Sequence, residues 1–271
     1  MIVEISDDQN VSLGPDRVIA DLFGDHARAI SAHDHVARSL GMDILSGAIA
    51  IGENLPHEEA LLERFQVSRT VLREGLKTLA AKGLIVSKTR VGTRVRPEAR
   101  WNFFDPDLLS WKLQLGYDEK FRDDLAEIRC AIEPQAAALA ALRRTDGDLL
   151  ELRNWIARMR EPGHTARSFA EADLGLHLSV SAASGNAMMR SIGAIIEAAL
   201  MASFTLNSAV EEEDVLEESI GRHEAIVDAI EQGDSDAAAA AMLLVIDQGT
   251  ARIRASMSSP EVRKTRKGKK G

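Results

Sequence analysis

An aspartate and two histidines have the residue types and the spacing that a metal site requires. Asp173 and His177 lie four residues apart in the segment EADLGLHLSV, so a helix would project both side chains from one face. His223 belongs to a separate amphipathic segment, SIGRHEAIVDAI. A carboxylate and two imidazoles that converge between helices can bind a divalent first-row metal such as zinc. The alternative is one buried histidine bonded to Asp173 and a second histidine at the surface, and the spacing alone favours that alternative.

Arginines and hydroxyl residues at the start of another segment have the chemistry of a DNA contact. The segment VSRTVLREGLKTLAAKGLI begins with Ser68, Arg69 and Thr70 after its valine, and Arg73 follows one turn later. Hydroxyl and backbone N–H groups at a helix start suit phosphate oxygens, and arginines can reach a phosphate or the edge of a guanine. The alternative is a surface helix with ordinary solvated arginines, which the flanking elements and the local charge argue against.

The elements around these arginines are predicted to form a winged helix-turn-helix. Residues 35–49 carry apolar side chains at helical spacing, Gly52 and Pro56 interrupt the pattern, and HEEALLERF forms a short amphipathic helix. The turn QVSR leads into the next helix, and the alternating stretch IVSKTRVGTRVRP around Gly92 predicts a β-hairpin. This order is typical of a winged helix-turn-helix, in which the second helix of the pair enters the major groove of double-stranded DNA.

Charge differs between two blocks of the chain. Residues 28–100 carry twelve Lys and Arg against eight Asp and Glu, whereas residues 101–257 carry fourteen against twenty-seven. A polyanion is attracted by the first block and repelled by the second, although the formal net charge of the whole chain is −9. The pattern predicts two domains with different partners. The last fourteen residues, with six Lys and Arg, are either a solvated end or a sequence-independent contribution to DNA binding.

The second block is predicted to be an all-α antiparallel bundle, which makes the chain mainly α. A short helix starts at Asp105-Pro106, and later helical segments are separated by short loops, which favour antiparallel neighbours. The expected helices lie near residues 119–143, 147–160, 165–184, 186–208, 211–232 and 234–257. The expected domains are a poorly ordered extension (1–27), the winged helix-turn-helix (28–98), a linker with a short helix (99–118), the helical domain (119–257) and a disordered basic tail (258–271).

Arg129 on the first long helix of this bundle is a candidate for effector binding. It lies one turn before Glu133 and Pro134. An arginine that faces a cavity between helices can bind a carboxylate with two parallel hydrogen bonds. A surface salt bridge is the alternative, and the sequence does not separate the two.

Cysteine content and hydropathy favour a cytoplasmic location. The single cysteine, Cys130, cannot form an internal disulfide. No apolar run approaches the roughly 18 residues that a helix needs to cross a bilayer. The N-terminal sequence MIVEISDDQN lacks the basic region and apolar stretch of a signal peptide, so no membrane partner is expected.

The segment LPHEEALLERFQVSRTVLREGLKTLAAKGLI resembles the DNA-binding signature of the GntR family of bacterial transcription regulators. That signature joins a Leu-Pro pair and a glutamate to a Val-Ser-Arg turn and an Arg-Glu helix. The resemblance implies that Arg69 and Arg73 contact DNA, that Ser68 and Thr70 contact phosphates, and that Gly92 lies at the tip of the wing.

The chain departs from the family pattern at Glu59. Some members carry a basic, DNA-contacting residue at this position. A carboxylate cannot make that phosphate contact, so the departure implies a different operator sequence or docking angle.

Three further segments, EIRCAIEPQAAALAA, ADLGLHLSVSAASGN and HEAIVDAIEQGDSDAAAAAM, resemble the FCD effector domain of the FadR-type branch of the same family. Many FCD domains hold a metal with an aspartate and three histidines and place an anionic effector against it. Asp173, His177 and His223 fall on three of these positions, whereas Val245, which cannot ligate, falls on the fourth. The resemblance therefore leaves three possibilities, which are weaker metal binding, a shell completed by water or effector oxygens, or no metal.

The stretch WNFFDPDLLSWKL and the missing last histidine resemble most the galactonate-responsive type within that branch. This resemblance implies a sugar acid or a related hydroxy acid as the effector. The family often uses the position of Arg129 to bind a carboxylate, which adds to its candidacy.

Together these features predict a one-component transcription regulator that binds operator DNA as a homodimer and represses a catabolic operon for a carbohydrate acid or another carboxylate. A small anionic effector would release it. A metal-dependent enzyme that uses Asp173, His177 and His223 is a different class of function. The sequence has no separate nucleophile, phosphate-binding glycine loop or general base near these residues, so no enzyme is expected. A third possibility is an architectural DNA binder whose helical domain only dimerises.

Overall fold

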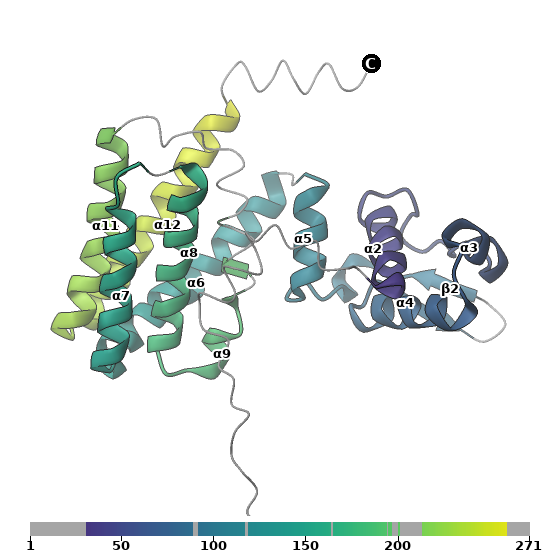
Figure 1. Cartoon of the computed structure of the whole chain (residues 1–271), viewed down its shortest axis with the longest axis horizontal. Coiled ribbons are helices and arrows are strands. Elements are labelled where there is room, and N and C mark those ends of the chain that lie inside the picture. Colours follow the sequence, from purple (N-terminus) through teal and green to yellow (C-terminus); the bar gives the residue numbers. More distant parts are fainter. Residues whose placement is uncertain are drawn as a thin grey trace, which may run out of the picture. The chain divides into compact units, whose positions relative to one another are not determined.

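The computed structural model describes residues 31–88, 92–116, 119–163, 165–193, 195–196, 200 and 213–258. The predicted N-terminal extension and the basic tail from residue 259 onward lie outside these residues. The chain divides into two compact units, and the division falls inside one long helix, between Ala131 and Ile132. Helices dominate both units, which confirms the prediction of a mainly α chain (Figure 1).

The first unit contains a helix-turn-helix followed by a two-stranded wing. Ser31 and Ser68 cap two of its helices, because each hydroxyl accepts a hydrogen bond from a backbone N–H of the first turn. The three main helices enclose an apolar core that includes Leu40, Leu72 and Leu79, each fully buried. The elements of this unit are α2 (Ala32–Leu45), α3 (Glu58–Phe65), α4 (Arg69–Ala81), β1 (Ile85–Lys88), β2 (Gly92–Val95), η1 (Glu98–Arg100) and α5 (Pro106–Gln114).

The wing is an antiparallel hairpin whose start depends on a glycine. The register pairs Ile85 with Val95 and ends at Gly92 of β2, and residues 89–91 between the strands lie outside the described residues. Gly83, between α4 and β1, has a φ of +80°, and a Cβ there would lie 2.1 Å from the carbonyl oxygen of Arg100. A side chain at this position would therefore be excluded both by the backbone conformation and by the close approach.

The short helix α5 packs into the core of the winged helix-turn-helix. Leu108 and Trp111 of α5 belong to the same apolar cluster as the side chains of α2 and α4. Lys82 at the end of α4 is buried, and its ammonium donates to Asp105 at 2.7 Å and to Asp107 at 2.6 Å. Burial lowers the pKa of Lys82, but the two carboxylates outweigh this effect and raise it above its ordinary value. The linker is thereby tied to the DNA-binding unit.

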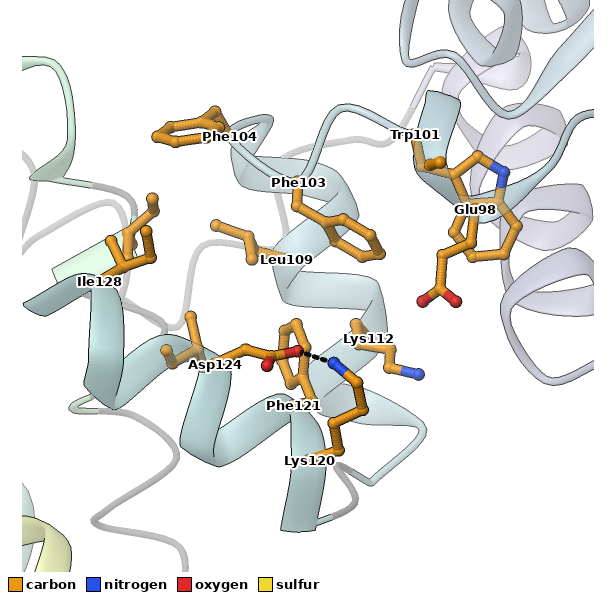
Figure 2. Close-up of a pocket in the computed structure, with 13 residues that line it drawn as sticks. Glu98, Trp101, Phe103, Phe104, Leu109, Lys112, Lys120, Phe121, Asp124 and Ile128 are labelled. Atoms are coloured by element: carbon orange, nitrogen blue, oxygen red, sulfur yellow. Dashed lines mark hydrogen bonds and ion pairs between the residues drawn. The ribbon is translucent and has the colours of Figure 1, made fainter.

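Aromatic side chains lead from this linker to the start of α6 (Glu119–Arg143), as Figure 2 shows. The ring centroids of Trp101 and Phe103 are 6.0 Å apart, and those of Phe103 and Phe121 are 6.1 Å apart. These three rings help to line a pocket of about 550 Å³. The first turns of α6 therefore pack against the linker through aromatic contacts.

All the regular secondary structure described in the second unit is helical. The observed helices follow the predicted segments closely, with one exception. None of the described helices is both long enough and apolar enough to cross a membrane. The elements are the second half of α6, then α7 (Asp146–Met159), α8 (Ala166–Ala183), α9 (Ala187–Arg190), α11 (Glu213–Gln232) and α12 (Ser235–Ser258) up to residue 248.

The prediction of one continuous helix over residues 186–208 is wrong. The helix α9 ends at Arg190, and Ser191 and Ile192 form a turn. Serine and glycine are poor helix formers, and Ser191 lies within this turn while Gly193 follows it directly. Residues 194, 197–199 and 201–208 lie outside the described residues.

Helix α7 packs against both α8 and α11. The contact with α8 depends on Gly175, where a Cβ would lie 2.6 Å from ring carbons of Trp155. Toward α11, Arg153 donates to Asp228 at 2.7 Å and Arg160 donates to Glu224 at 2.6 Å. α7 therefore holds the two helices that carry the predicted metal ligands.

The substitution Gly175→Ala is expected to lower the free energy of unfolding of the helical unit by about 1–3 kcal/mol, because the added methyl group overlaps the Trp155 ring. The matched control is Gly221→Ala on α11, where a Cβ meets nothing within 4 Å. There the change should raise stability by roughly 0.5–1 kcal/mol, since alanine favours helix. Urea unfolding followed by circular dichroism measures both effects, and equal shifts in the two variants would contradict the packing described.

Candidate DNA-binding face and metal centre

The predicted DNA contacts lie at the start of α4. Ser68 is the N-cap, and its hydroxyl accepts from the backbone N–H of Val71 at 3.3 Å. Arg69, Thr70 and Arg73 are exposed on the turns that follow. Exposed arginines beside a helix N-terminus form a surface that attracts phosphate oxygens. The structure thus places the four predicted residues of α4 on one accessible helix end.

The two arginines share a carboxylate that the sequence reasoning missed. Glu58, the first residue of α3, has one oxygen 3.2 Å from Arg69 and the other 3.8 Å from Arg73. The sequence shows Glu58 only as an acidic residue at the start of a helix. Acidic residues are common there because they interact favourably with the helix dipole, so the pairing with the arginines could not be inferred. The DNA-binding face therefore contains a carboxylate as well as the two guanidinium groups.

The remaining predicted features of this face are at the wing and on α3. Gly92 opens β2 with a φ of +100°, a conformation that favours glycine. Glu59 is exposed on the first turn of α3. The departure from the basic residue of some relatives therefore lies at the protein surface.

Asp173 and His177 of α8 and His223 of α11 come together inside the helical unit. One ligand atom of each lies within 4.8 Å of the others. The Asp173 Oδ1 atom is 2.7 Å from Nε2 of His223 and 3.4 Å from Nε2 of His177. All three residues are buried, with 7% or less of each exposed. Residues that are four and fifty apart in the sequence thus form one buried cluster.

The other nitrogen of each imidazole already has an acceptor. Nδ1 of His177 contacts the carboxylate of Glu133 on α6, and Nδ1 of His223 lies 2.8 Å from the carbonyl oxygen of Ser219, one turn earlier on α11. A hydrogen on each Nδ1 leaves the Nε2 lone pairs directed toward Asp173. Metal-binding histidines are commonly held in this way by outer partners. The sequence reasoning assigned no role to Glu133 or Ser219.

Three atoms at the centre of the cluster lack hydrogen bonds. Asp173 Oδ1, His177 Nε2 and His223 Nε2 are buried, and no described residue gives any of them a well-aligned hydrogen bond. Asp173 Oδ1 and His223 Nε2 are nonetheless only 2.7 Å apart. A buried polar atom without a partner costs about 1–3 kcal/mol. Because a single divalent cation would satisfy all three atoms, this donor set fits a metal.

The charged groups of the cluster shift the pKa values of Asp173 and His177 in opposite directions. Burial raises the pKa of Asp173, but the imidazoles of His223 and His177 outweigh burial and hold it well below its usual range. Burial lowers the pKa of His177, but the carboxylates of Glu133 and Asp173 outweigh burial and raise it to about 9. A cation that binds Nε2 of His177 must displace a proton, so metal binding would release protons.

Arg129, the predicted effector-binding residue, and Val245, at the position of the fourth metal ligand, are not among the three clustered ligands. Arg129 is buried on α6, in the half of that helix that belongs to the first unit. Val245 is half-buried on α12 and offers no ligand atom. Among the described residues, the cluster therefore supplies one carboxylate and two imidazoles.

Family models match both parts of the chain. The model for bacterial regulatory proteins of the gntR family matches residues 32–95, and the model for the FCD domain matches residues 124–248. These segments contain the winged helix-turn-helix and the whole of the buried cluster. The family models therefore match the same two parts of the chain that the structure describes as a winged helix-turn-helix and a helical unit.

Curated relatives and solved structures agree with this assignment. The galactonate operon transcriptional repressor of Escherichia coli K12 is 32% identical over 221 residues, which cover 82% of this chain and 96% of that protein. The regulator LutR of Bacillus subtilis is 29% identical over 203 residues, covering 74% and 91%. A solved structure of Lar, described as controlling the agr system of Listeria monocytogenes, has 18% identity and a TM-score of 0.58 over 83% of this chain and 97% of that one. That last likeness supports the fold alone.

The family and the curated relatives are regulators rather than enzymes, which confirms the predicted class of function and the absence of an enzymatic one. The chain belongs to the GntR family of bacterial regulatory proteins, carries an FCD domain, and is a transcriptional regulator of the type that includes the galactonate operon repressor.

Proposed function

We propose that this regulator is a homodimeric repressor of an operon for the catabolism of a hydroxy acid, and that a divalent metal at Asp173, His177 and His223 anchors its effector. The observation that carries the metal assignment is the set of three buried ligand atoms within 4.8 Å of one another, each without a hydrogen bond among the described residues. Glu133 and Ser219 hold the two imidazoles in the orientation that binding requires.

The chemistry of the effector is inferred from the donor set and from two relatives. The galactonate operon repressor and an E. coli protein named as a putative L-lactate dehydrogenase operon regulator, 30% identical over 219 residues, are named for galactonate and lactate. Both acids carry a hydroxyl beside the carboxylate, and these two oxygens can chelate one cation. When bound, the metal would supply a Lewis-acidic anchor for them. Three protein ligands, with Val245 at the fourth position, leave room for two effector oxygens.

The DNA-binding part of the proposal follows from two-fold symmetry. Each protomer of a dimer would place one α4 in one half-site of a two-fold operator. If the effector weakens operator binding, operator DNA weakens effector binding by the same factor, since linkage is reciprocal. An architectural DNA binder would show no such coupling.

Removing Arg69 tests the DNA-binding face. Arg69→Ala should weaken operator binding by about tenfold to hundredfold, because an arginine that reads a base edge contributes roughly 1–3 kcal/mol. Lys77→Ala is the control, since it removes one charge from the same helix two turns later. Fluorescence anisotropy at fixed salt, with a duplex selected from a random library, measures both affinities. Equal losses would mean that only net charge matters and would contradict the assignment of the helix start.

Removing Asp173 tests the metal centre. Asp173→Ala should abolish stoichiometric binding of Co²⁺ and Zn²⁺, measured by visible absorption and by elemental analysis after dialysis. Glu133→Gln, which changes only an outer partner, should weaken binding by about 10–100-fold. His57→Ala is the control, because that histidine is exposed in the first unit. If the native protein binds neither ion, the metal proposal is contradicted, whereas the proposal of DNA binding is not affected.

Matched acids test the effector class. L-Lactate and D-galactonate should raise the thermal unfolding temperature of the metal-loaded protein, whereas propionate, which is lactate without its hydroxyl, should not. A ligand at 100 times its dissociation constant stabilises the folded state by about 2.7 kcal/mol. A chelator should abolish the shift. A shift that survives chelation would overturn metal anchoring and make Arg129 the first residue to substitute.

A further inference from the structure

One carboxylate bridges the two arginines that the DNA-binding face presents. Oε1 of Glu58 lies 3.2 Å from Arg69, and Oε2 lies 3.8 Å from Arg73. The arginines are four residues apart, so both project from the same side of α4. Glu58 comes from the neighbouring helix α3, and each of its oxygens pairs with a different guanidinium group.

A DNA backbone presents the same chemistry to these arginines. An anion that pairs its two oxygens with two guanidinium groups is an arrangement that a phosphate also adopts. The N–H group that Arg69 donates to Glu58 cannot bind DNA at the same time, and the charge of Arg73 is partly neutralised by the same carboxylate at 3.8 Å. We propose that Glu58 is an intramolecular competitor of DNA, which holds Arg69 and Arg73 until a phosphate or a base edge displaces its carboxylate.

The exposure of the three side chains makes this exchange feasible. The side chains of Arg69 and Arg73 are 66% and 64% exposed, and that of Glu58 is 38% exposed. Water screens exposed ion pairs, so each changes an equilibrium constant by only about 1.5-fold to fivefold. Such a pair lowers DNA affinity without preventing binding.

The competition has a consequence for selectivity. Binding to DNA of arbitrary sequence depends almost entirely on charge neutralisation, and a genome offers a very large number of such sites. By neutralising one of two positive charges, Glu58 weakens this background binding. At an operator, base-edge contacts add to the phosphate contacts and compensate for the displaced carboxylate.

The test uses the full-length protein and a short mixed-sequence duplex, so it needs no effector, metal or identified operator. Glu58→Gln should raise affinity for this duplex by about threefold to tenfold at fixed salt. It should also steepen the dependence of log K on log salt by roughly one, because one more phosphate is neutralised. The control is Glu63→Gln, which removes the same charge from an exposed position of α3 whose side chain forms no ion pair with a described residue.

A double-mutant cycle separates competition from simple charge removal. In the background Arg69→Ala/Arg73→Ala, the substitution Glu58→Gln should change affinity no more than Glu63→Gln does, because the groups it releases are gone. Two outcomes would overturn the proposal. One is an equal effect of Glu58→Gln and Glu63→Gln in the native background. The other is a loss of affinity in Glu58→Gln, which would make Glu58 a residue that positions the arginines for DNA.

Discussion

Three ionisable side chains buried between α8 and α11 impose the constraint on which the helical unit depends. Asp173, His177 and His223 are almost fully removed from water. The loss of hydration costs several kcal/mol per ion unless other groups replace the water. The imidazoles obtain such partners on their outer nitrogens, but the inner atoms do not. Helix α7 maintains this arrangement through contacts with both helices. Its Trp155 ring packs closely against Gly175 of α8, and its arginines pair with acidic residues of α11. A bundle held this firmly keeps three donors at a separation that suits one cation.

The DNA-binding unit uses charged groups in the opposite way. Arg69, Arg73 and Glu58 remain in contact with water, so their pairing is weak and can be exchanged. Where a charge in the same unit is buried, as at Lys82, two carboxylates satisfy it and it serves the fold. In this unit the buried charge of Lys82 stabilises the fold, whereas the exposed charges of Arg69 and Arg73 are accessible to a binding partner.

Local patterns predicted most elements, and contacts between elements had to come from the structure. Apolar periodicity predicted a helix over residues 119–143, which α6 matches, because helical spacing is a property of neighbouring residues. The same reasoning failed at residues 186–208, where the apolar pattern continues through a turn. Spacing also placed two metal-site candidates on one face of α8. It could not find Glu133, which reaches a histidine 44 positions away, or Glu58, which pairs across the helix-turn-helix. No local periodicity records such pairings.

The helix α6 has side-chain contacts in both compact units. Glu133 contacts the imidazole of His177, and Phe121 near the start of the same helix packs against the linker ring of Phe103. Pro134 lies inside α6, just after the point where the compact units divide, and it removes one backbone hydrogen bond from the helix. An effector can alter DNA affinity only as far as its own affinities for two states of the protein differ. In this chain one helix, with a proline near its middle, carries both the partner of His177 and a ring that packs on the linker.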